Sequence, residues 1–235
     1  MKRDLPKMTF LTSIMCQHVG IAQDGFYSGL DEDRNFYTAP NTTFLDKLGY
    51  KFDVKHDRVD CRTDGDIEDG LPLIIGSDAN ANINCLVVGQ TGSDQKLRIL
   101  KSFYVKYERK LPELAQDFCD YYKYLKYKRV IFYYDATFVG NSYATHTEDF
   151  YQIVSKVLRQ AGWLVTEVYI GKPWNHLQKQ ELINRMFKGR ANHMILINKD
   201  NNDDLIISIE SAGCYNNGKD KRGEKLVETD EDRLE

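Results

Sequence analysis

Two aspartates stand where predicted strands end, and their residue type suits metal chemistry. Asp78 closes the apolar run 71–78, and Asp135 closes the run 128–135. If the two strands are neighbours in one sheet, they lie about 5 Å apart, and both carboxylates point into one small volume. Carboxylates that close repel each other and raise each other's pKa unless a cation is present. The pair therefore predicts a divalent-metal site.

The chemistry of such a site follows from its oxygen donors. Carboxylate oxygens suit hard ions such as Mg²⁺ or Mn²⁺. Two such ions, about 3.5–4 Å apart, can activate water and stabilise the leaving oxygen of a phosphodiester. We therefore expect Asp78 and Asp135 to be metal-binding and catalytic, with two Mg²⁺ or Mn²⁺ ions as cofactors. For either residue alone, the competing interpretation is a simple turn former after a strand.

The elements that must position this pair are predicted from apolar runs and helical spacing. Short turn segments between the first three runs predict antiparallel strands. The predicted order is strands at 71–78, 83–90 and 96–107, a helix at 111–127, a strand at 128–135, a helix at 147–162 capped by Thr147, a strand at 163–171, a helix at 176–189 and a short apolar segment at 193–198.

This order predicts an α/β fold with a mixed sheet flanked by helices. Helices that link the third strand to the fourth, and the fourth to the fifth, require right-handed crossovers. The fourth and fifth strands then lie most easily beside the first and parallel to it. Ligands of such sheets gather at the carboxyl ends of the parallel strands, where the strand order reverses.

Composition restricts the remaining possibilities. The net charge of −3 argues against a wholly basic nucleic-acid-binding surface but permits a local basic groove. The five scattered cysteines indicate reduced thiols, and no run approaches the roughly 20 apolar residues of a membrane span. Residues 1–70 are rich in aromatic and turn residues, so we interpret them as a linker or the tail of a preceding domain, followed by one domain at 71–235.

A basic strip and a tyrosine cluster are further candidates. The strip could contact phosphates, although exposed helix faces often carry such charges. Its members are Lys172, Lys179, Arg185, Lys188 and Arg190. The tyrosines from Tyr121 to Tyr127 could stack on bases, but their helical spacing favours core packing.

Several segments taken in series carry a family resemblance: LPLIIGSDANANINCLVVGQ, VIFYYDATFVGNSY, GKPWNHLQKQELINRMFKGR, ILIN and DLIISIESA. Over about residues 71 to 233, the chain resembles the nuclease domain of phage terminase large subunits. The resemblance implies an RNase H-like fold and a metal-dependent endonuclease that cuts concatemeric double-stranded DNA during packaging. It matches Asp78 to the family's first metal-binding acid and Asp135 to the second. It also implies the bacterial host cytosol, with a packaging ATPase domain in the parent chain and the portal and small terminase subunit as partners.

One departure from the family concerns its third acid, which normally opens the last helix. Here Asp220, Asp230 and Asp232 are only weak substitutes, and each also reads as solvated surface charge. No G-x-x-x-x-G-K-[ST] phosphate loop is present, so we expect a fragment that lacks the ATPase domain and is truncated at its C-terminus. Two alternatives stay open: another RNase H-like nuclease such as a resolvase, and a non-catalytic docking module that retains the fold.

Overall fold

The computed structural model describes residues 25–49, 59–79, 83–140, 148–172, 174–215 and 218–219. The strands are β1 (Phe36–Tyr37), β2 (Leu73–Ala79), β3 (Ile83–Thr91), β4 (Lys96–Lys106), β5 (Arg129–Tyr134), β6 (Leu164–Tyr169), β7 (Met194–Asn198), β8 (Cys214–Tyr215) and β9 (Gly218–Lys219). The α-helices are α2 (Glu32–Asn35), α3 (Thr42–Leu48), α4 (Leu111–Tyr121), α5 (Phe150–Gln160), α6 (His176–Phe187) and α7 (Asp203–Glu210). Short 3₁₀ turns are η2 (Cys61–Thr63), η3 (Ala136–Phe138) and η4 (Lys199–Asn201).

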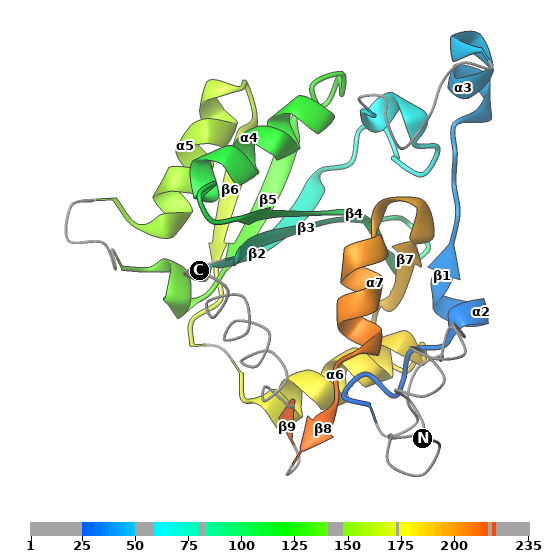
Figure 1. The fold of residues 1–235 in the computed structure, drawn as a ribbon, viewed down its shortest axis with the longest axis vertical. Helices are drawn as coiled ribbons and strands as arrows, with labels where there is room; N and C mark the ends of the chain where they lie inside the picture. Colours follow the sequence, from blue (N-terminus) through cyan, green and yellow to red (C-terminus); the bar gives the residue numbers. More distant parts are fainter. Residues whose placement is uncertain are drawn as a thin grey trace, which may run out of the picture.

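One seven-stranded mixed sheet, ordered β1-β7-β4-β3-β2-β5-β6, organises the molecule (Figure 1). β2, β3 and β4 form an antiparallel meander, while β5 lies parallel to β2 and β6 parallel to β5. The prediction of three antiparallel strands followed by parallel crossover strands beside the first is confirmed. The part β4-β3-β2-β5-β6 has the strand directions expected of an RNase H-like mixed sheet, and β7 and β1 extend it at the β4 edge.

The larger core lies between the sheet and the pair α4 and α5, which lie side by side over one face (Figure 1). α4 begins with Pro112 in its first turn, and the backbone N–H of Lys110 donates to Glu113 Oε2 at 2.9 Å, which caps the helix start. Leu114 and Phe118, four residues apart, are fully buried on its inner face. α4 therefore forms because one stripe of its surface can be buried against the strands.

α4 is shorter than the predicted helix at 111–127. The helix ends at its C-cap Tyr122 (φ −92°, ψ 14°), where both Tyr121 and Tyr122 are buried, and the chain then returns to start β5. The interpretation of these two tyrosines as core residues is confirmed. α5 likewise begins at Phe150 with Asp149 as its N-cap, while the predicted cap Thr147 lies outside the described residues.

A second core lies on the other side of the sheet, at the β7 end. Phe187 of α6 and Ile206 of α7 pack there against Ile195 and Ile197 of β7. β7 runs parallel to β4, and β1 adds a short parallel edge to β7. The sequence predicted the apolar segment that forms β7 but not its neighbours, because either edge of a mixed sheet can accept a parallel strand.

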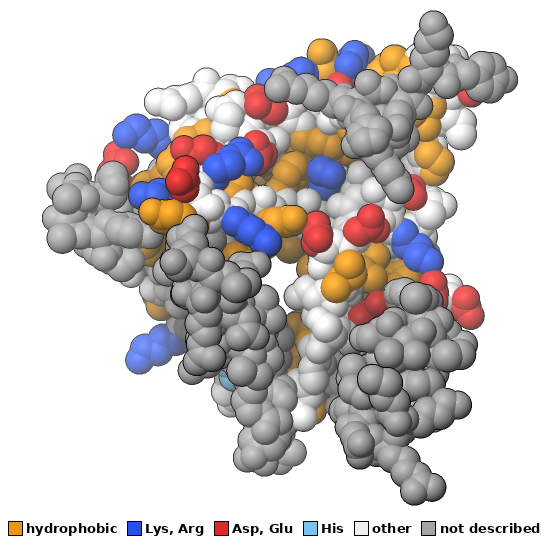
Figure 2. Space-filling model, in the orientation of Figure 1, with side chains coloured by type: hydrophobic (Ala, Val, Ile, Leu, Met, Phe, Trp, Pro, Cys, Tyr) orange, Lys and Arg blue, Asp and Glu red, His pale blue; other side chains and the backbone are white. Residues whose placement is uncertain are grey.

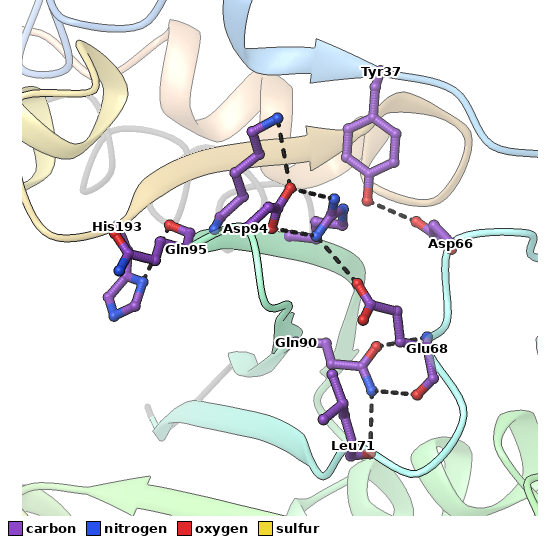
Figure 3. A network of polar contacts seen from close by, with 10 residues as sticks. Tyr37, Asp66, Glu68, Leu71, Gln90, Asp94, Gln95 and His193 are labelled. Carbon is purple, nitrogen blue, oxygen red and sulfur yellow. Dashed lines mark hydrogen bonds and ion pairs between the residues drawn. The ribbon is translucent and has the colours of Figure 1, made fainter.

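The described part of the N-terminal region is tied into this sheet. The fully buried amide of Asn35 donates to the carbonyls of Phe187 and Ile195, both at 2.9 Å. The buried Gln90 side chain accepts from the Glu68 N–H at 2.9 Å and donates to the carbonyls of Glu68 and Leu71 (Figure 3). The boundary near residue 70 stays a prediction about domains, but these contacts pack the segments on either side of it together.

None of the helices in the described residues combines the length and apolar character needed to cross a bilayer. The described cysteines Cys61, Cys85, Cys119 and Cys214 are free thiols.

Candidate active site

The register of β2 and β5 brings the two predicted ligands to neighbouring positions. Gly76 is the partner of Tyr133 in this parallel pair, so continuing the register by two residues places Asp78 beside Asp135. Asp135 has extended backbone angles, φ −108° and ψ −173°, so the strand geometry continues to it. The sequence-based expectation that these strands are neighbours is therefore met.

Both aspartates also lie on the same face of the sheet. Leu73 and Ile75 of β2 are buried in the core beneath α4 and α5, and so is Phe132 of β5. Because side chains alternate along a strand, Asp78 and Asp135 lie on the opposite face. We call this the carboxylate face, meaning the face of β2, β3, β4 and β5 that is turned away from α4 and α5.

The chain holds Asp135 in place through the turn that follows β5. Its Oδ1 accepts from the backbone N–H of Thr137 at 2.9 Å and from the Thr137 hydroxyl at 2.5 Å. Asp135 is thus the N-cap of η3, and two local contacts on one oxygen orient its carboxylate. These two hydrogen bonds show that Asp135 forms a turn after β5. The same carboxylate can also serve as a metal ligand, since only one of its oxygens takes part in the turn.

Asp78 is exposed near the end of β2. It lies between Asp135, which follows β5, and a residue of β3 on its other side. Cys85 is the cross-strand partner of Asp78, so its thiol lies on the carboxylate face as well. Burial, followed by the negative charge of Asp78, raises the pKa of the Cys85 thiol. The thiol is therefore neutral at physiological pH.

The oxygen donors of Asp78 and Asp135 suit the predicted metal in type but not in number. Two carboxylates at adjacent strand ends supply the oxygen donors that Mg²⁺ and Mn²⁺ prefer. Within the described ranges, however, no group of three or more His, Cys, Asp or Glu side chains is placed to hold an ion. The weak third-acid candidates Asp220, Asp230 and Asp232 lie outside the described residues. Asp78 and Asp135 therefore fit part of a metal site.

The predicted basic strip runs along and beyond α6, away from β2. Lys179 and Arg185 lie on α6, Lys188 and Arg190 follow its end, and Lys172 precedes it. α6 packs against β7, and β4 and β3 separate β7 from β2 in the sheet. In the view of Figure 2, basic and acidic side chains are interspersed, without one dominant basic patch. A phosphate-contact role for the strip stays a prediction.

The outer side of α6 carries two adjoining shallow hollows. One, of about 250 Å³, is lined by Trp174, Gln178, Glu181, Leu182 and Arg185. The other, of about 370 Å³, shares Leu182 and Arg185 with it. The guanidinium of Arg185 donates to the carbonyl of Arg190 at 3.4 Å, so this member of the basic strip is partly engaged within the chain.

A second carboxylate centre, around Asp64, was not anticipated from the sequence. Asp64 accepts from the Tyr121 hydroxyl at 2.8 Å and from the Asn201 amide at 3.0 Å. Burial raises the pKa of Asp64 to about 6, against the lowering effect of these donors. Lys101 lies nearby with its ammonium 4.6 Å from the Tyr121 ring centroid, and burial lowers its pKa.

Asp66 continues this centre towards the sheet edge. Its Oδ2 accepts from the Tyr37 hydroxyl at 2.7 Å (Figure 3) and from the Asn198 amide at 2.9 Å. Burial, then the charge of Asp66, raises the pKa of Tyr37 well above its usual range. The acidic stretch at 60–70 looked like a linker, and no local signal marks its partners, which come from β1, β4, α4, β7 and η4.

Comparisons with known proteins come from structure alone, since no family model and no curated protein matches the sequence. A structure of T. thermophilus RuvC in complex with a Holliday junction substrate shares 16% sequence identity, covers 50% of this chain and 79% of that chain, and gives a TM-score of 0.31. A human cytomegalovirus terminase nuclease domain, soaked with Mn, shares 11% identity, covers 63% of this chain and 74% of that chain, and gives a TM-score of 0.38.

A second structure of RuvC, from Thermus thermophilus, shares 16% identity, covers 48% of this chain and 69% of that chain, and gives a TM-score of 0.26. These overlaps are partial. The assignment of the fold class rests on the sheet itself, in which the antiparallel strands β4, β3 and β2 are followed by β5 and β6, parallel to β2.

Proposed function

We propose that this chain carries a divalent-metal-dependent DNA endonuclease domain of a phage or prophage packaging terminase. The observation that supports this most is the pairing of Asp78 and Asp135 on one face, at the carboxyl ends of adjacent parallel strands. That is the place where sheets with reversing strand order bind ligands. The terminase assignment is supported by the series of motifs from residue 71 onward.

In this proposal, Asp78 and Asp135 hold one side of the metal site through carboxylate oxygens. When bound, Mg²⁺ or Mn²⁺ would supply charge neutralisation and an activated water for phosphodiester hydrolysis. Thr137 fixes one oxygen of Asp135, which orients that carboxylate before substrate arrives. The described residues include no side chain that we nominate as general base.

The test compares plasmid nicking in Mn²⁺ for wild type, Asp78→Asn and Asp135→Asn. We expect each substitution to lower the nicking rate by about 100-fold or more, because each removes a charged metal ligand. Asp120→Asn is the matched control, because Asp120 is an exposed carboxylate on α4, over the opposite face. Equal nicking by all variants would refute the assignment of these two residues.

Metal binding gives a readout that does not depend on activity. Terbium binds at oxygen sites and emits when a nearby tyrosine transfers energy to it, and Tyr133 lies on the carboxylate face two residues before Asp135. We expect sensitised emission from wild type and Asp120→Asn, and its loss in Asp78→Asn and Asp135→Asn. Asp220→Asn, Asp230→Asn and Asp232→Asn, measured in parallel, identify the third ligand among the candidates.

The substrate separates the proposed terminase nuclease from the two alternatives. Nicking of linear and supercoiled duplex without preference for branched DNA supports the packaging nuclease. A strong preference for four-way junctions would indicate a resolvase. Intact folding with neither metal binding nor nicking would indicate a docking module.

A further inference from the structure

Tyr133 and Tyr134 are adjacent in β5 but have opposite environments. The Tyr134 ring is stacked on Tyr151 of α5, with centroids 4.4 Å apart and planes 6° apart. Tyr133 lies on the carboxylate face with 39% of its surface exposed. Among the contacts of the described residues, the Tyr133 ring has no aromatic pair, no cation and no side-chain hydrogen bond. The fold thus uses Tyr134 for packing and leaves Tyr133 without a comparable structural role.

The flank of Tyr133 is kept clear by Gly76. This glycine is the cross-strand partner of Tyr133 in β2, and it is exposed. A Cβ built on Gly76 would meet no atom of the described residues within 4 Å, so among these residues the space beside the tyrosine ring is open. A larger residue there would cover part of the ring, because directly paired side chains on one face are in contact. We call the Tyr133 ring and the adjoining backbone of Gly76, which has no side chain, the platform.

The platform adjoins the carboxylate pair. Tyr133 precedes Asp135 by two residues on the same face, which is about 7 Å along an extended strand. A single nucleotide can reach from a phosphate at the carboxylates to a base over Tyr133. Stacking of a base on an aromatic side chain stabilises binding of unpaired nucleotides, whereas a regular duplex keeps the faces of its bases covered.

We propose that Tyr133, with Gly76 beside it, stacks on an unpaired base next to the phosphodiester held at Asp78 and Asp135. The substrate class of this site is therefore DNA with an unpaired or flipped nucleotide at the cleavage point. This inference rests on the proposed nuclease function and goes further by naming the state of the DNA that the site accepts.

The experiment measures DNA binding by fluorescence anisotropy, without divalent metal, for a duplex, the same duplex with a central unpaired stretch, and a single strand. We expect wild type to bind the two DNAs that contain unpaired bases more tightly than the duplex. Tyr133→Ala should weaken only that extra binding, by about tenfold, whereas Tyr133→Phe should keep it, since stacking needs the ring and not the hydroxyl. Gly76→Val should mimic Tyr133→Ala by covering the ring.

Tyr169→Ala is the matched control, because Tyr169 is also an exposed strand tyrosine but packs against Tyr134 on the opposite face. A fluorescent adenine analogue in the unpaired stretch reports stacking directly, and its emission should be quenched by wild type and Tyr133→Phe but not by Tyr133→Ala. Thermal unfolding of each variant checks that the fold is intact.

The outcomes separate this inference from the proposed function. Carboxylate-dependent nicking with no difference between wild type and Tyr133→Ala in binding or quenching overturns the platform and leaves the nuclease standing. Quenching that requires Tyr133, without carboxylate-dependent nicking, supports the platform and overturns the nuclease. Equal affinity of wild type for duplex and unpaired DNA, or no binding to either, overturns the platform.

Discussion

The molecule contains two centres of paired carboxylates, and they are built in opposite ways. Asp64 and Asp66, the interior centre, are partly buried between packed elements, and side chains from several of these elements donate to them. Asp78 and Asp135 lie at strand ends, where Asp78 is exposed and Asp135 is held by a local turn. The first arrangement uses carboxylates to join segments of the fold, at the cost of burying charge. The second leaves carboxylate oxygens where a ligand can approach.

The largest expected effect on stability is at the interior centre. Asp64→Ala removes the acceptor for the Tyr121 hydroxyl and the Asn201 amide, and unpaired buried donors are costly. At pH 5 we expect the free energy of unfolding to fall by about 2–4 kcal/mol, measured by urea denaturation. A loss below about 0.5 kcal/mol would contradict the structural role given to Asp64.

The interior centre should also make the free energy of unfolding depend on pH, through Asp64. The pKa of Asp64 is about 6 in the folded chain, above its ordinary value of 3.8, so the folded state binds the proton more tightly. The stabilisation is complete below about pH 4 and is lost as the pH rises through about 6. Between about pH 4 and pH 6, we expect Asp64 to lower the free energy of unfolding by roughly 1–3 kcal/mol.

Asp64→Asn provides the comparison for this measurement. The amide is close in shape to the neutral carboxyl and does not titrate, so the variant should lose that component of the pH profile. The difference between the wild-type and variant unfolding curves at each pH isolates Asp64 from the other titrating groups. Parallel profiles for the two proteins would show that Asp64 does not titrate with a raised pKa.

The smallest effects on the free energy of unfolding are expected for substitutions at the strand ends, at Asp78 and Asp135. Asn at position 135 can still accept from the Thr137 N–H, and the side chain at position 78 is exposed to solvent. We expect Asp78→Asn and Asp135→Asn each to change the free energy of unfolding by less than about 0.5 kcal/mol in the absence of metal. A large destabilisation by either would make that carboxylate a structural residue, and the contrast between the two centres would disappear.

The exposed centre was predictable from sequence for a physical reason. Continuous apolar runs mark buried strands, and an acid directly after such a run must lie at the strand end. The positions of Asp78 and Asp135 therefore followed from local patterns plus the handedness of crossovers. Whether they bind metal stays a prediction, because the weak candidates for a third acid, Asp220, Asp230 and Asp232, fall outside the described residues.

The interior centre was not predictable because its contacts are made between distant segments. Asp64 is 57 residues from Tyr121 and 137 residues from Asn201. In sequence, Asp64 and Asp66 stand among glycines and other acids, a composition typical of solvated turns. Only the packing of the 59–72 segment over the sheet turns them inward. The neighbours of β7 could not be predicted for the same reason, because β7 pairs with strands that are distant in the sequence.

The buried amide of Asn35 has a consequence for synthesis of the protein. Its bond to the carbonyl of Ile195 spans 160 residues, and among the strands of the described residues β1 pairs with β7 alone. On the ribosome, the segment that contains Asn35 emerges early but finds its partner only after the β7 segment has followed, a delay on the order of ten seconds. During that interval the meander of β2, β3 and β4 can assemble, so translation order makes the N-terminal edge the last part of the sheet to close.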